Sequence, residues 1–327
     1  MKTEAVLISG GCGYIGSHVA RQLSDAGYRP VVIDTLVTGF RELLVCDEAF
    51  VHGNCADKNL VTKTINEHKI TTVMHFAASA VVPESVAHPM AYYSNNVANS
   101  LALIEASVAA GVKNFIFSST GSVYGENAPV PAGEDDRAEP TNPYSRSKLI
   151  TEWMLKDIAA ATGLNHAILR YFNVAGADPG GRQGQKSKTA THLIKIAAEV
   201  ACGKRESLNV YGSDYDTPDG TGVRDYIHVE DLASAHLAAM NFLVKGGASG
   251  TFNCGYGHGF SVLEVIRAVE AVTGKPLPVK MAPRRPGDIS SSVADNRKIK
   301  DQLAWRPKFD NLETIVRHAM AWEKSLD

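Results

Sequence analysis

The chain has few cysteines, no excess of charge of either sign and no long apolar run, and each absence excludes a class of protein. Its 327 residues include five cysteines, an odd number, and no two of them form a Cys-x-x-Cys pair. A disulfide framework or a zinc site is therefore not expected, and a reducing cytoplasm fits best. Lysine and arginine number 33 against 35 aspartate and glutamate residues. This balance argues against nucleic acid or an anionic membrane as the main partner.

No apolar run approaches the roughly 18 residues of a membrane-spanning helix. The first such run, Ala5–Ile8, is also too short for the apolar region of a signal peptide. What is present is ordinary globular composition, with 44% hydrophobic and 21% charged residues. We therefore expect a cytoplasmic protein of about two domains, with ample material for a buried core.

Short unbroken apolar runs alternate with segments of helical periodicity in the first two-thirds of the chain. The runs are Ala5–Ser9, Pro30–Asp34, Thr72–Phe76, Asn114–Ser118 and His166–Tyr171. Such strands are typical of parallel sheets that are covered on both faces. The spacing of Val97, Leu101, Ile104 and Val108 predicts a helix that ends at Gly111. The alternation predicts an α/β fold with a Rossmann-type, doubly wound parallel sheet.

The pattern changes after Asn173. Glycine-rich and charged loops occupy residues 178–188, 212–222 and 281–292, with short helical segments between them. Long loops of this kind in a compact protein are often functional. We therefore expect a smaller C-terminal α/β domain that closes over a ligand.

A glycine-rich turn follows the first predicted strand. Gly10, Gly13 and Gly16 recur at three-residue spacing and open a helical pattern. Glycine permits the tight turn and lets the backbone approach a pyrophosphate, which the helix N-terminus attracts. The second strand ends in Asp34, 18 residues after Gly16. A carboxylate there accepts hydrogen bonds from a ribose 2′-OH and repels a 2′-phosphate, so the turn and the acid predict NAD rather than NADP.

Tyr144 and Lys148 are the candidate catalytic pair. Their spacing places both side chains on one face of a helix if Asn142 and Pro143 open that helix. A lysine ammonium beside a phenol favours the phenolate, so Tyr144 could act as a base near neutral pH. The spacing alone is common, but this helix follows the strand at 114–118 and starts at the carboxyl edge of the sheet. Ligands bind at that edge in this architecture.

The ordered motifs resemble the extended short-chain dehydrogenase/reductases, and among them the nucleotide-sugar 4-epimerases. The matching segments are Gly10–Gly16, Asp34, His75–Ala78, Tyr92–Asn99, Phe115–Gly125, Tyr144–Lys148, Arg170–Gly176, Gly222–Asp231 and Pro283–Asp288. The resemblance implies bound NAD, a UDP-sugar substrate, a homodimer and inversion at sugar C4. In the implied reaction, hydride passes from C4 to NAD, the 4-keto sugar turns over, and hydride returns to its opposite face.

The resemblance also assigns roles to residues. Tyr144 is expected to remove the 4-OH proton, Lys148 to bind the nicotinamide ribose and lower the Tyr144 pKa, and Thr120 to bind the 4-oxygen. The implied cofactor contacts are Gly10, Gly13, Tyr14, Ile15, Gly16, Asp34, Asn54, Phe76, Ala77, Ala78, Asn95, Ser118, Tyr144, Lys148 and Tyr171. The implied substrate contacts are Thr120, Tyr144, Asn173, His192, Leu193, Asn209, Tyr211, Arg224, Arg285, Asp288 and Ser292. The two arginines are expected at the diphosphate, because a planar guanidinium can bind phosphate through two hydrogen bonds.

The same resemblance implies the division of the chain. We expect the NAD-binding domain at 1–172 and 224–252, and the nucleotide-sugar domain at 173–223 and 253–327. The implied dimer contact runs through helices near 91–110 and 144–162. No metal site is expected.

Four positions depart from common family patterns. Asn54 stands where many relatives have Asp beside the adenine, and Ala80 replaces a common Lys, which predicts looser NAD retention. His192 replaces a common Asn near the phosphates. A surface helix residue without a ligand is an equally supported interpretation. Ser292 stands where relatives restricted to plain hexoses have Tyr. A small side chain there leaves room for an N-acetyl sugar.

Other activities stay open. Sugar 4,6-dehydratases carry an Asp-Glu pair directly after the strand-end threonine, whereas Thr120 precedes Gly121 and Ser122. A 4-epimerase of an N-acetylated or uronic sugar is the closer alternative. Non-catalytic dinucleotide sensors on this fold commonly lack the Tyr and Lys that are present here. His75 and His228 lie in apolar strands, and we expect both to be core histidines with satisfied hydrogen bonds.

Overall fold

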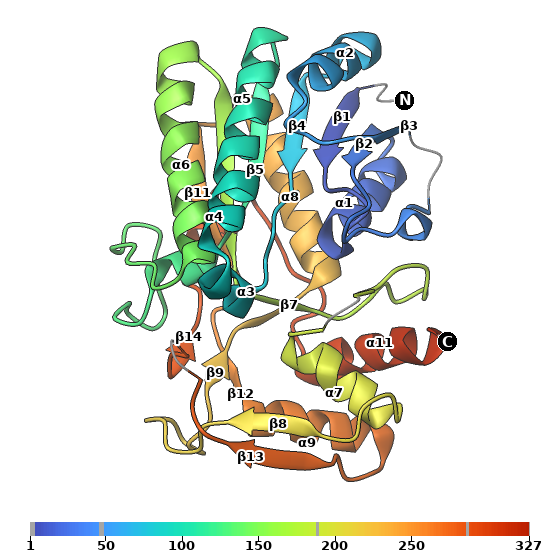
Figure 1. The fold of residues 1–327 in the computed structure, drawn as a ribbon, viewed down its shortest axis with the longest axis vertical. Coiled ribbons are helices and arrows are strands. Elements are labelled where there is room, and N and C mark those ends of the chain that lie inside the picture. The colour runs from blue at the N-terminus through green and yellow to red at the C-terminus, as the bar shows by residue number, and fades with distance from the viewer. Residues whose placement is uncertain (1–3, 46–48, 188–189, 286–287, 327) are drawn as a thin grey trace.

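A seven-stranded, fully parallel sheet forms the centre of the computed structural model, which describes residues 4–45, 49–187, 190–285 and 288–326 (Figure 1). Its strand order is β11-β6-β5-β4-β1-β2-β3. The strands are β1 Ala5–Ser9, β2 Arg29–Asp34, β3 Ala49–His52, β4 Thr72–His75, β5 Asn114–Thr120, β6 Asn165–Tyr171 and β11 Gly250–Cys254. The order reverses at β1, which pairs with both β2 and β4. In doubly wound sheets, this reversal point is where ligands bind.

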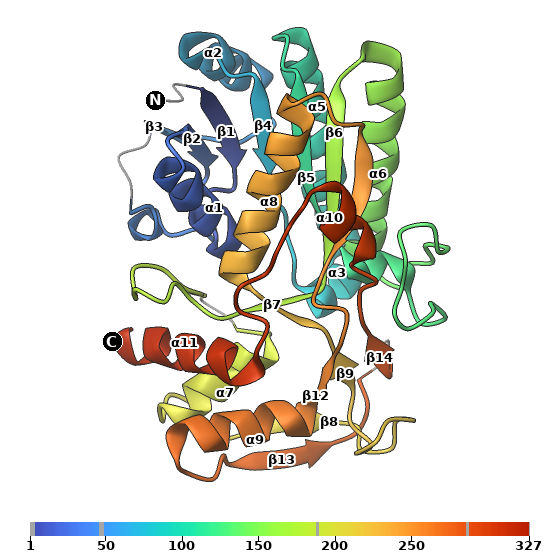
Figure 2. The same cartoon turned by 180° about the vertical axis from the view of Figure 1, so that it is seen from behind.

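Helices cover both faces of the sheet, as predicted (Figures 1 and 2). Helices α2 Lys58–His68, α5 Asn99–Ala109 and α6 Pro143–Thr162 lie on one face, and α1 Tyr14–Asp25 and α8 Val229–Val244 on the other. Successive strand residues enter separate cores. Leu7 and Ile33 pack with the residues of α2 and α5, whereas Ile8 and Val32 pack with those of α1 and α8. Burial on both faces explains why these strands are unbroken apolar runs.

The five predicted strands are confirmed, and two strands of the central sheet were missed. β3 is a short, partly exposed edge strand, and β11 mixes glycine, threonine and asparagine with apolar residues, so neither forms an apolar run. The predicted helix at 97–111 is α5, and Gly111 follows its end with a φ of +79°. Val97 lies just before it, in a π-helical segment at Tyr93–Ala98.

Smaller sheets and helices form the C-terminal part, in the lower half of Figure 1. Its strands are β7 Asn173–Ala175, β8 Leu208–Tyr211, β9 Val223–Arg224, β10 Tyr226–His228, β12 Phe260–Ser261, β13 Val279–Ala282 and β14 Ser291–Ser292. Its helices are α7 Leu193–Ala201, α9 Val262–Thr273 and α11 Leu312–Ser325. Helix α10 Arg297–Gln302 packs beside β11, and the short helices α3 Val82–Ala87 and α4 Pro89–Tyr92 precede the π-helical segment. This part lies below the carboxyl edge of the central sheet.

Candidate active site

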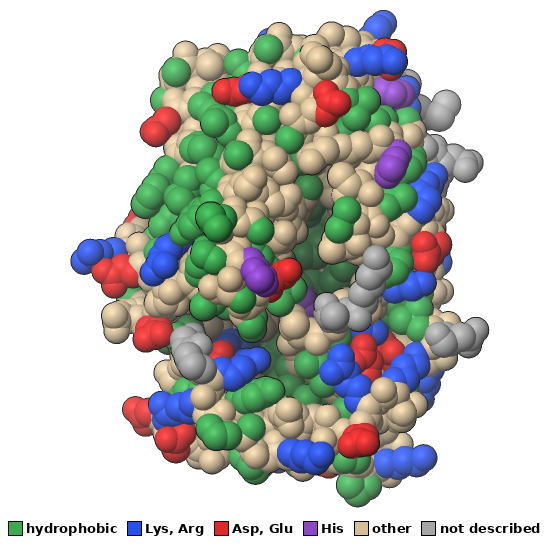
Figure 3. Space-filling model, viewed as in Figure 1, with side chains coloured by type: hydrophobic (Ala, Val, Ile, Leu, Met, Phe, Trp, Pro, Cys, Tyr) green, Lys and Arg blue, Asp and Glu red, His purple; other side chains and the backbone are tan. Residues whose placement is uncertain are grey.

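The carboxyl ends of β1, β2, β4, β5 and β6 meet at one edge of the central sheet, which faces the C-terminal part. Figure 3 shows a hollow in the molecular surface between the two parts. The predicted site residues that follow these strands therefore lie along one edge. They come from segments that are far apart in the chain.

The glycine turn after β1 shows why glycine is needed there. Gly10 has a φ of +74°, and a Cβ on it would lie 2.6 Å from the backbone nitrogen of Ala77. A Cβ on Gly16 would collide with the Gly10 carbonyl oxygen. Helix α1 starts after Gly13 without a side-chain cap, so its first N–H groups stay available to an anion.

Asp34 is held in place by the same turn. Its two carboxylate oxygens accept hydrogen bonds from the backbone N–H groups of Cys12, at 3.0 Å, and Leu36, at 2.8 Å. The carboxylate thus stands beside the uncapped helix start at the end of β2. The glycine turn leaves space that a Cβ would fill, and the open helix N-terminus beside it suits a pyrophosphate. The carboxylate at the end of β2 suits a ribose with a free 2′-OH. Together these features fit a dinucleotide.

The other predicted cofactor residues extend along this edge. Tyr14 reaches from α1 and donates to the Gly176 carbonyl at 2.6 Å, which ties the first helix to the chain after β7. Asn54 is exposed and accepts from the Ala56 N–H, and Asn95 donates to the Ser79 hydroxyl at 3.1 Å. Ile15, Phe76, Ala77, Ala78 and Tyr171 are half-buried.

Tyr144 lies in the first turn of α6, where the predicted cap is confirmed: Asn142 Oδ1 accepts from the Ser145 N–H, and Pro143 is the first helical residue. The Tyr144 side chain is 9% exposed, and burial raises its pKa to about 12, opposed by a hydrogen bond from Thr120. Thr120 ends β5, so the structure brings the predicted base and the predicted hydroxyl into contact.

Lys148 lies one turn further along α6 and is also buried. Its Nζ donates to the Ser118 carbonyl at 2.9 Å, and burial lowers its pKa to about 8 against the opposing charge of Glu152. The expectation that Lys148 lowers the Tyr144 pKa does not match this arrangement. The opposing effect on Tyr144 comes from Thr120, because the lysine is directed at the Ser118 carbonyl.

A chain of hydroxyl groups behind Thr120 was missed by sequence reasoning. Thr120 Oγ1 lies 2.9 Å from Ser122 Oγ, which lies 2.8 Å from Ser145 Oγ, and Ser145 donates to Asn142 at 3.1 Å. The capping pattern Asn-x-x-Ser was the available signal for Ser145. No local pattern marks Ser122, whose role depends on the fold of two separate segments.

A buried ion pair beneath the strand end was also missed. Arg170 on β6 binds Glu152 on α6, with Nη2 2.6 Å from Oε2. Ser119 donates to the same carboxylate. Both charged side chains are almost fully buried, so removing either would leave an uncompensated charge in the core. The pair fixes α6 against β6.

The predicted substrate residues form a second group, in the C-terminal part. Arg285 Nε donates to Asp288 Oδ2 at 2.8 Å, and its guanidinium lies 4.6 Å from the Tyr211 ring centre. Ser292 on β14 pairs with Arg224 on β9. Asn209 donates to the Tyr211 hydroxyl at 3.3 Å. The structure thus joins these residues into one cluster, which we call the arginine cluster.

Asn173, His192 and Leu193 are the remaining predicted substrate residues. Asn173 is half-buried on β7, and its N–H donates to the Asp225 carbonyl. His192 is the residue before α7 and Leu193 is the first of that helix. His192 is exposed to solvent, and partial loss of water around its ring lowers its pKa. Its Nδ1 lies 2.7 Å from Gln185 Nε2.

The two strand histidines are satisfied core residues, as expected. His75 contacts the hydroxyls of Ser9 and Ser100, at 2.6 and 2.7 Å, and burial lowers its pKa to about 3. His228 accepts from the Glu230 N–H and contacts His318 at 3.0 Å. Neither is available for proton transfer at the edge of the sheet.

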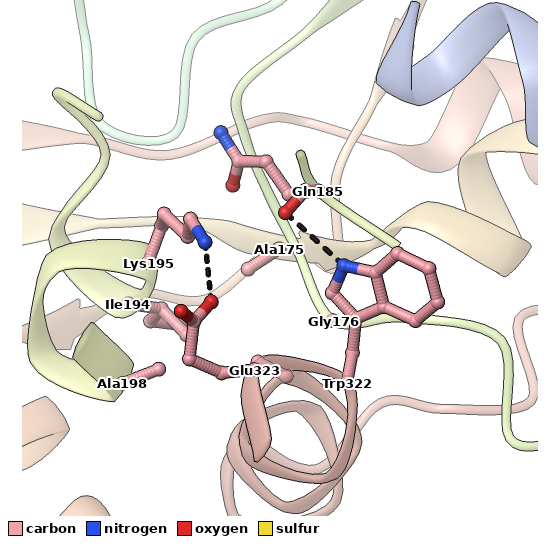
Figure 4. A pocket seen from close by; sticks show the side chains of 9 residues that line it. Ala175, Gly176, Gln185, Ile194, Lys195, Ala198, Trp322 and Glu323 are labelled. Carbon is pink, nitrogen blue, oxygen red and sulfur yellow. Dashed lines mark hydrogen bonds and ion pairs between the residues drawn. The ribbon is translucent and has the colours of Figure 1, made fainter. Parts of the chain in front are cut away.

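Two cavities lie away from the catalytic pair. The smaller, about 10 Å³, holds no more than a water molecule and is crossed by the Lys195–Glu323 ion pair (Figure 4). In the same view, the Trp322 indole donates to the Gln185 carbonyl. The larger, about 380 Å³, lies beside α1 and α8, where Arg21 and Arg182 face Asp178 and Glu230. These two arginines and two carboxylates are already paired with one another.

Comparison with known proteins identifies the family. The model of the NAD dependent epimerase/dehydratase family matches residues 6–255. The chain belongs to this family. It is 52% identical over 322 residues to the UDP-glucose 4-epimerase of Azospirillum brasilense, covering 98% of this chain and 92% of that protein.

Solved structures of family members agree with this assignment. The UDP-glucose 4-epimerase of Brucella ovis in complex with NAD superposes with a TM-score of 0.94 at 43% identity, covering 97% of this chain and 98% of that one. The UDP-Glc/GlcNAc 4-epimerase of Campylobacter jejuni superposes with a TM-score of 0.86 at 46% identity, covering 98% and 99%.

Two further observations concern only the part of the chain that the structure describes. None of its helices combines the length and apolar character needed to cross a bilayer. Nor do three or more His, Cys, Asp or Glu side chains gather there in a way that could hold a metal ion.

Proposed function

We propose that the protein is a UDP-glucose 4-epimerase that interconverts UDP-galactose and UDP-glucose with NAD as its cofactor. The observation that carries the proposal is the contact of Tyr144 with Thr120 at the carboxyl edge of the sheet, one helical turn from Lys148. The relatives at 42–52% identity that carry this activity support it. When bound, NAD supplies reversible hydride chemistry, and its candidate binding residues are the glycine turn, Asp34 and Lys148.

In this proposal, the side chains at the edge of the sheet transfer the proton of the sugar 4-OH and bind its oxygen. Tyr144 accepts the proton of the sugar 4-OH and later returns it. Thr120, oriented by Ser122, donates a hydrogen bond to the same oxygen. Lys148, whose Nζ is held by the Ser118 carbonyl, is the proposed partner of the nicotinamide ribose. Water is excluded because Tyr144 and Lys148 are both buried.

The arginine cluster is the proposed site for the nucleotide of the substrate. Arg224 and Arg285 supply positive charge and planar donors for a diphosphate. Asn209 and Tyr211 lie on β8 as the proposed neighbours of the base, and Asp288 as that of its ribose. Asn173 and His192 are further proposed contacts of the bound UDP-sugar.

We also propose that two copies of the chain associate through the helices near 91–110 and 144–162, together with α3 and α4, which pack against α6. Val86, Met90 and Trp153 are 62%, 85% and 55% exposed on these helices, which is a large apolar area for a free surface. Apolar side chains gather on that flank in Figure 3. A homodimer of this kind would leave the carboxyl edge of the central sheet open to ligands in both copies. Light scattering coupled to size exclusion tests it, with Trp153→Glu expected to give a monomer.

The proposed domain division follows the sequence prediction, with residues 1–172 and 224–252 holding NAD and the remainder holding the nucleotide sugar. A cytoplasmic location is proposed from the cysteine content, and Cys55, Cys202 and Cys254 are free thiols in the structure.

The deciding experiment is to incubate the purified protein with UDP-galactose, without added NAD, and to measure UDP-glucose. Conversion to the equilibrium mixture is expected, together with NAD(H) released on denaturation. Absence of conversion, with or without added NAD, would overturn the proposal. A dehydratase would instead release a 4-keto-6-deoxy sugar, and a non-catalytic sensor would bind NAD without turnover.

A further inference from the structure

Tyr215 lies in the loop between β8 and β9, and nothing in the sequence marked it as a site residue. Its side chain is 7% exposed, yet its hydroxyl has no hydrogen-bond partner among the residues that the structure describes. Buried polar groups are almost always paired, because an unpaired one loses its water without compensation. An unpaired buried hydroxyl therefore points to a partner that comes from outside the chain.

The surrounding loop holds the Tyr215 ring in one place. The Arg284 guanidinium lies 4.1 Å from the ring centre and is itself fixed by Asp214, 2.7 Å from its Nε. On another side, a Cβ on Gly212 would lie 2.5 Å from the ring, and Gly212 has a φ of +79°. The backbone N–H of Tyr215 donates to the Gly220 carbonyl at 2.9 Å. A ring positioned this firmly presents its hydroxyl in a fixed direction.

The Tyr215 ring lies beside the arginine cluster. The guanidinium over the ring belongs to Arg284, which is next to Arg285, and Gly212, which packs against the ring, follows Tyr211. Burial raises the pKa of Tyr215, Asp288 raises it further, and Arg284, Arg224 and Arg285 oppose this rise, as expected of charged groups near the ring. Arg284 is paired with Asp214 and Arg285 with Asp288.

Arg224 carries the unbalanced charge of this group. Its hydrogen bonds go to the carbonyls of Val223 and Ser290, and no described carboxylate pairs with it. The cluster therefore has one positive charge in excess, beside an unused hydroxyl donor. That combination suits an anion with several acceptor oxygens, and a diphosphate is such an anion.

We propose that the Tyr215 hydroxyl binds the substrate by donating a hydrogen bond to its diphosphate, beside Arg224 and Arg285. This rests on the proposed function, because it assumes that the arginine cluster receives a UDP-sugar. Tyr215 is a binding residue in this account, and it takes no part in proton or hydride transfer. The ligand supplies the partner that the free protein lacks.

The test is Tyr215→Phe, which keeps the ring and removes only the hydroxyl. Calorimetric titration of the NAD-loaded protein with UDP is expected to show about tenfold weaker binding, the usual cost of losing one hydrogen bond to a charged group. Binding of uridine, which has no phosphate, is expected to stay unchanged. The KM for UDP-galactose should rise with little change in kcat. The melting temperature should be unchanged or higher, because no hydrogen bond within the protein is lost.

The matched control is Tyr28→Phe, far from the cleft, where the hydroxyl donates to Asn241 at 2.7 Å. It should leave UDP binding unchanged and lower the melting temperature. Unchanged UDP affinity in Tyr215→Phe would overturn the inference, as would an equal loss for UDP and uridine. A failure of the proposed function looks different, because wild-type protein itself would then bind neither UDP nor UDP-galactose.

Discussion

The dinucleotide edge and the arginine cluster differ in how far the protein itself fixes their polar groups. At the edge, Asp34 accepts two backbone hydrogen bonds and Lys148 donates to a backbone carbonyl. These contacts leave both side chains in place before any ligand arrives. In the cluster, Arg285 and Asp288 are paired with each other, and the Tyr215 hydroxyl is paired with nothing that the structure describes.

This difference indicates how the dinucleotide edge and the arginine cluster would each bind a ligand. A preorganised site loses little conformational freedom and little internal bonding on binding, so it suits a cofactor that stays bound. In the cluster, a ligand must replace the exposed Arg285–Asp288 pair, which lowers its net affinity. A substrate that must leave after each turnover suits that arrangement.

Tyr144→Phe is expected to have the largest effect. Loss of a positioned base should lower kcat for UDP-galactose by about 10³-fold, within the usual range for general acid–base catalysis. The edge is otherwise intact, so the NAD content and melting temperature should match those of the wild type. Turnover near the wild-type rate would contradict the role of Tyr144 and weaken the assignment of the whole edge.

Lys148→Met should make the protein more stable while abolishing activity. Burial lowers the Lys148 pKa from 10.5 to about 8, so holding its charge at pH 7 costs the folded state about 3 kcal/mol. The lost hydrogen bond to Ser118 returns about 1 kcal/mol of this. Urea unfolding of both proteins at pH 7, each freed of NAD, should therefore show a gain of about 2 kcal/mol.

The pH dependence gives the sign of this effect. Between pH 8 and 10.5 the unfolded lysine is protonated and the folded one is not, so wild-type stability should rise across this interval relative to that of the variant. The gain from Lys148→Met should therefore disappear near pH 10.5. A variant that is less stable at pH 7, or a gain independent of pH, would contradict the pKa and show that Lys148 is mainly structural.

Sequence reasoning succeeded at the edge because its signals are local. The unbroken strands, the three glycines, Asp34 and the Tyr144–Lys148 spacing each lie within a few residues of one another or at a strand end. It failed where the partners are remote. The Ser122–Ser145 contact joins two segments, the Arg170–Glu152 pair joins β6 to α6, and the Tyr215 ring is fixed by Arg284 from a distant loop. No periodicity encodes such contacts.

Asp34→Asn should reduce the preference for NAD over NADP by about tenfold. The amide keeps an oxygen for one of the two backbone N–H donors, but it removes the charge that repels a 2′-phosphate and one acceptor for the ribose. Titration of cofactor-free protein with NAD and NADP measures the ratio. An unchanged ratio, with both affinities intact, would show that another group selects the cofactor.

The smallest expected effect concerns substrate breadth and rests on Ser292. Its backbone is fixed, since β14 pairs with β9 and the Ser292 carbonyl accepts from the Asp225 N–H at 2.9 Å. The space beside Arg224 therefore depends on the size of the side chain at position 292. We expect the wild type to interconvert UDP-N-acetylglucosamine and UDP-N-acetylgalactosamine, and the similar Campylobacter jejuni protein is described as a UDP-Glc/GlcNAc 4-epimerase.

Ser292→Tyr should lower that activity about fivefold, while UDP-galactose turnover stays within about twofold, because a phenol ring would take the volume of the N-acetyl group. Ser291→Tyr is the matched control, because neighbouring strand residues point to opposite faces. It should leave the ratio of the two activities unchanged. If the wild type has no N-acetyl activity, or if Ser292→Tyr lowers both activities equally, the space at Ser292 does not set specificity, and the surrounding loops do.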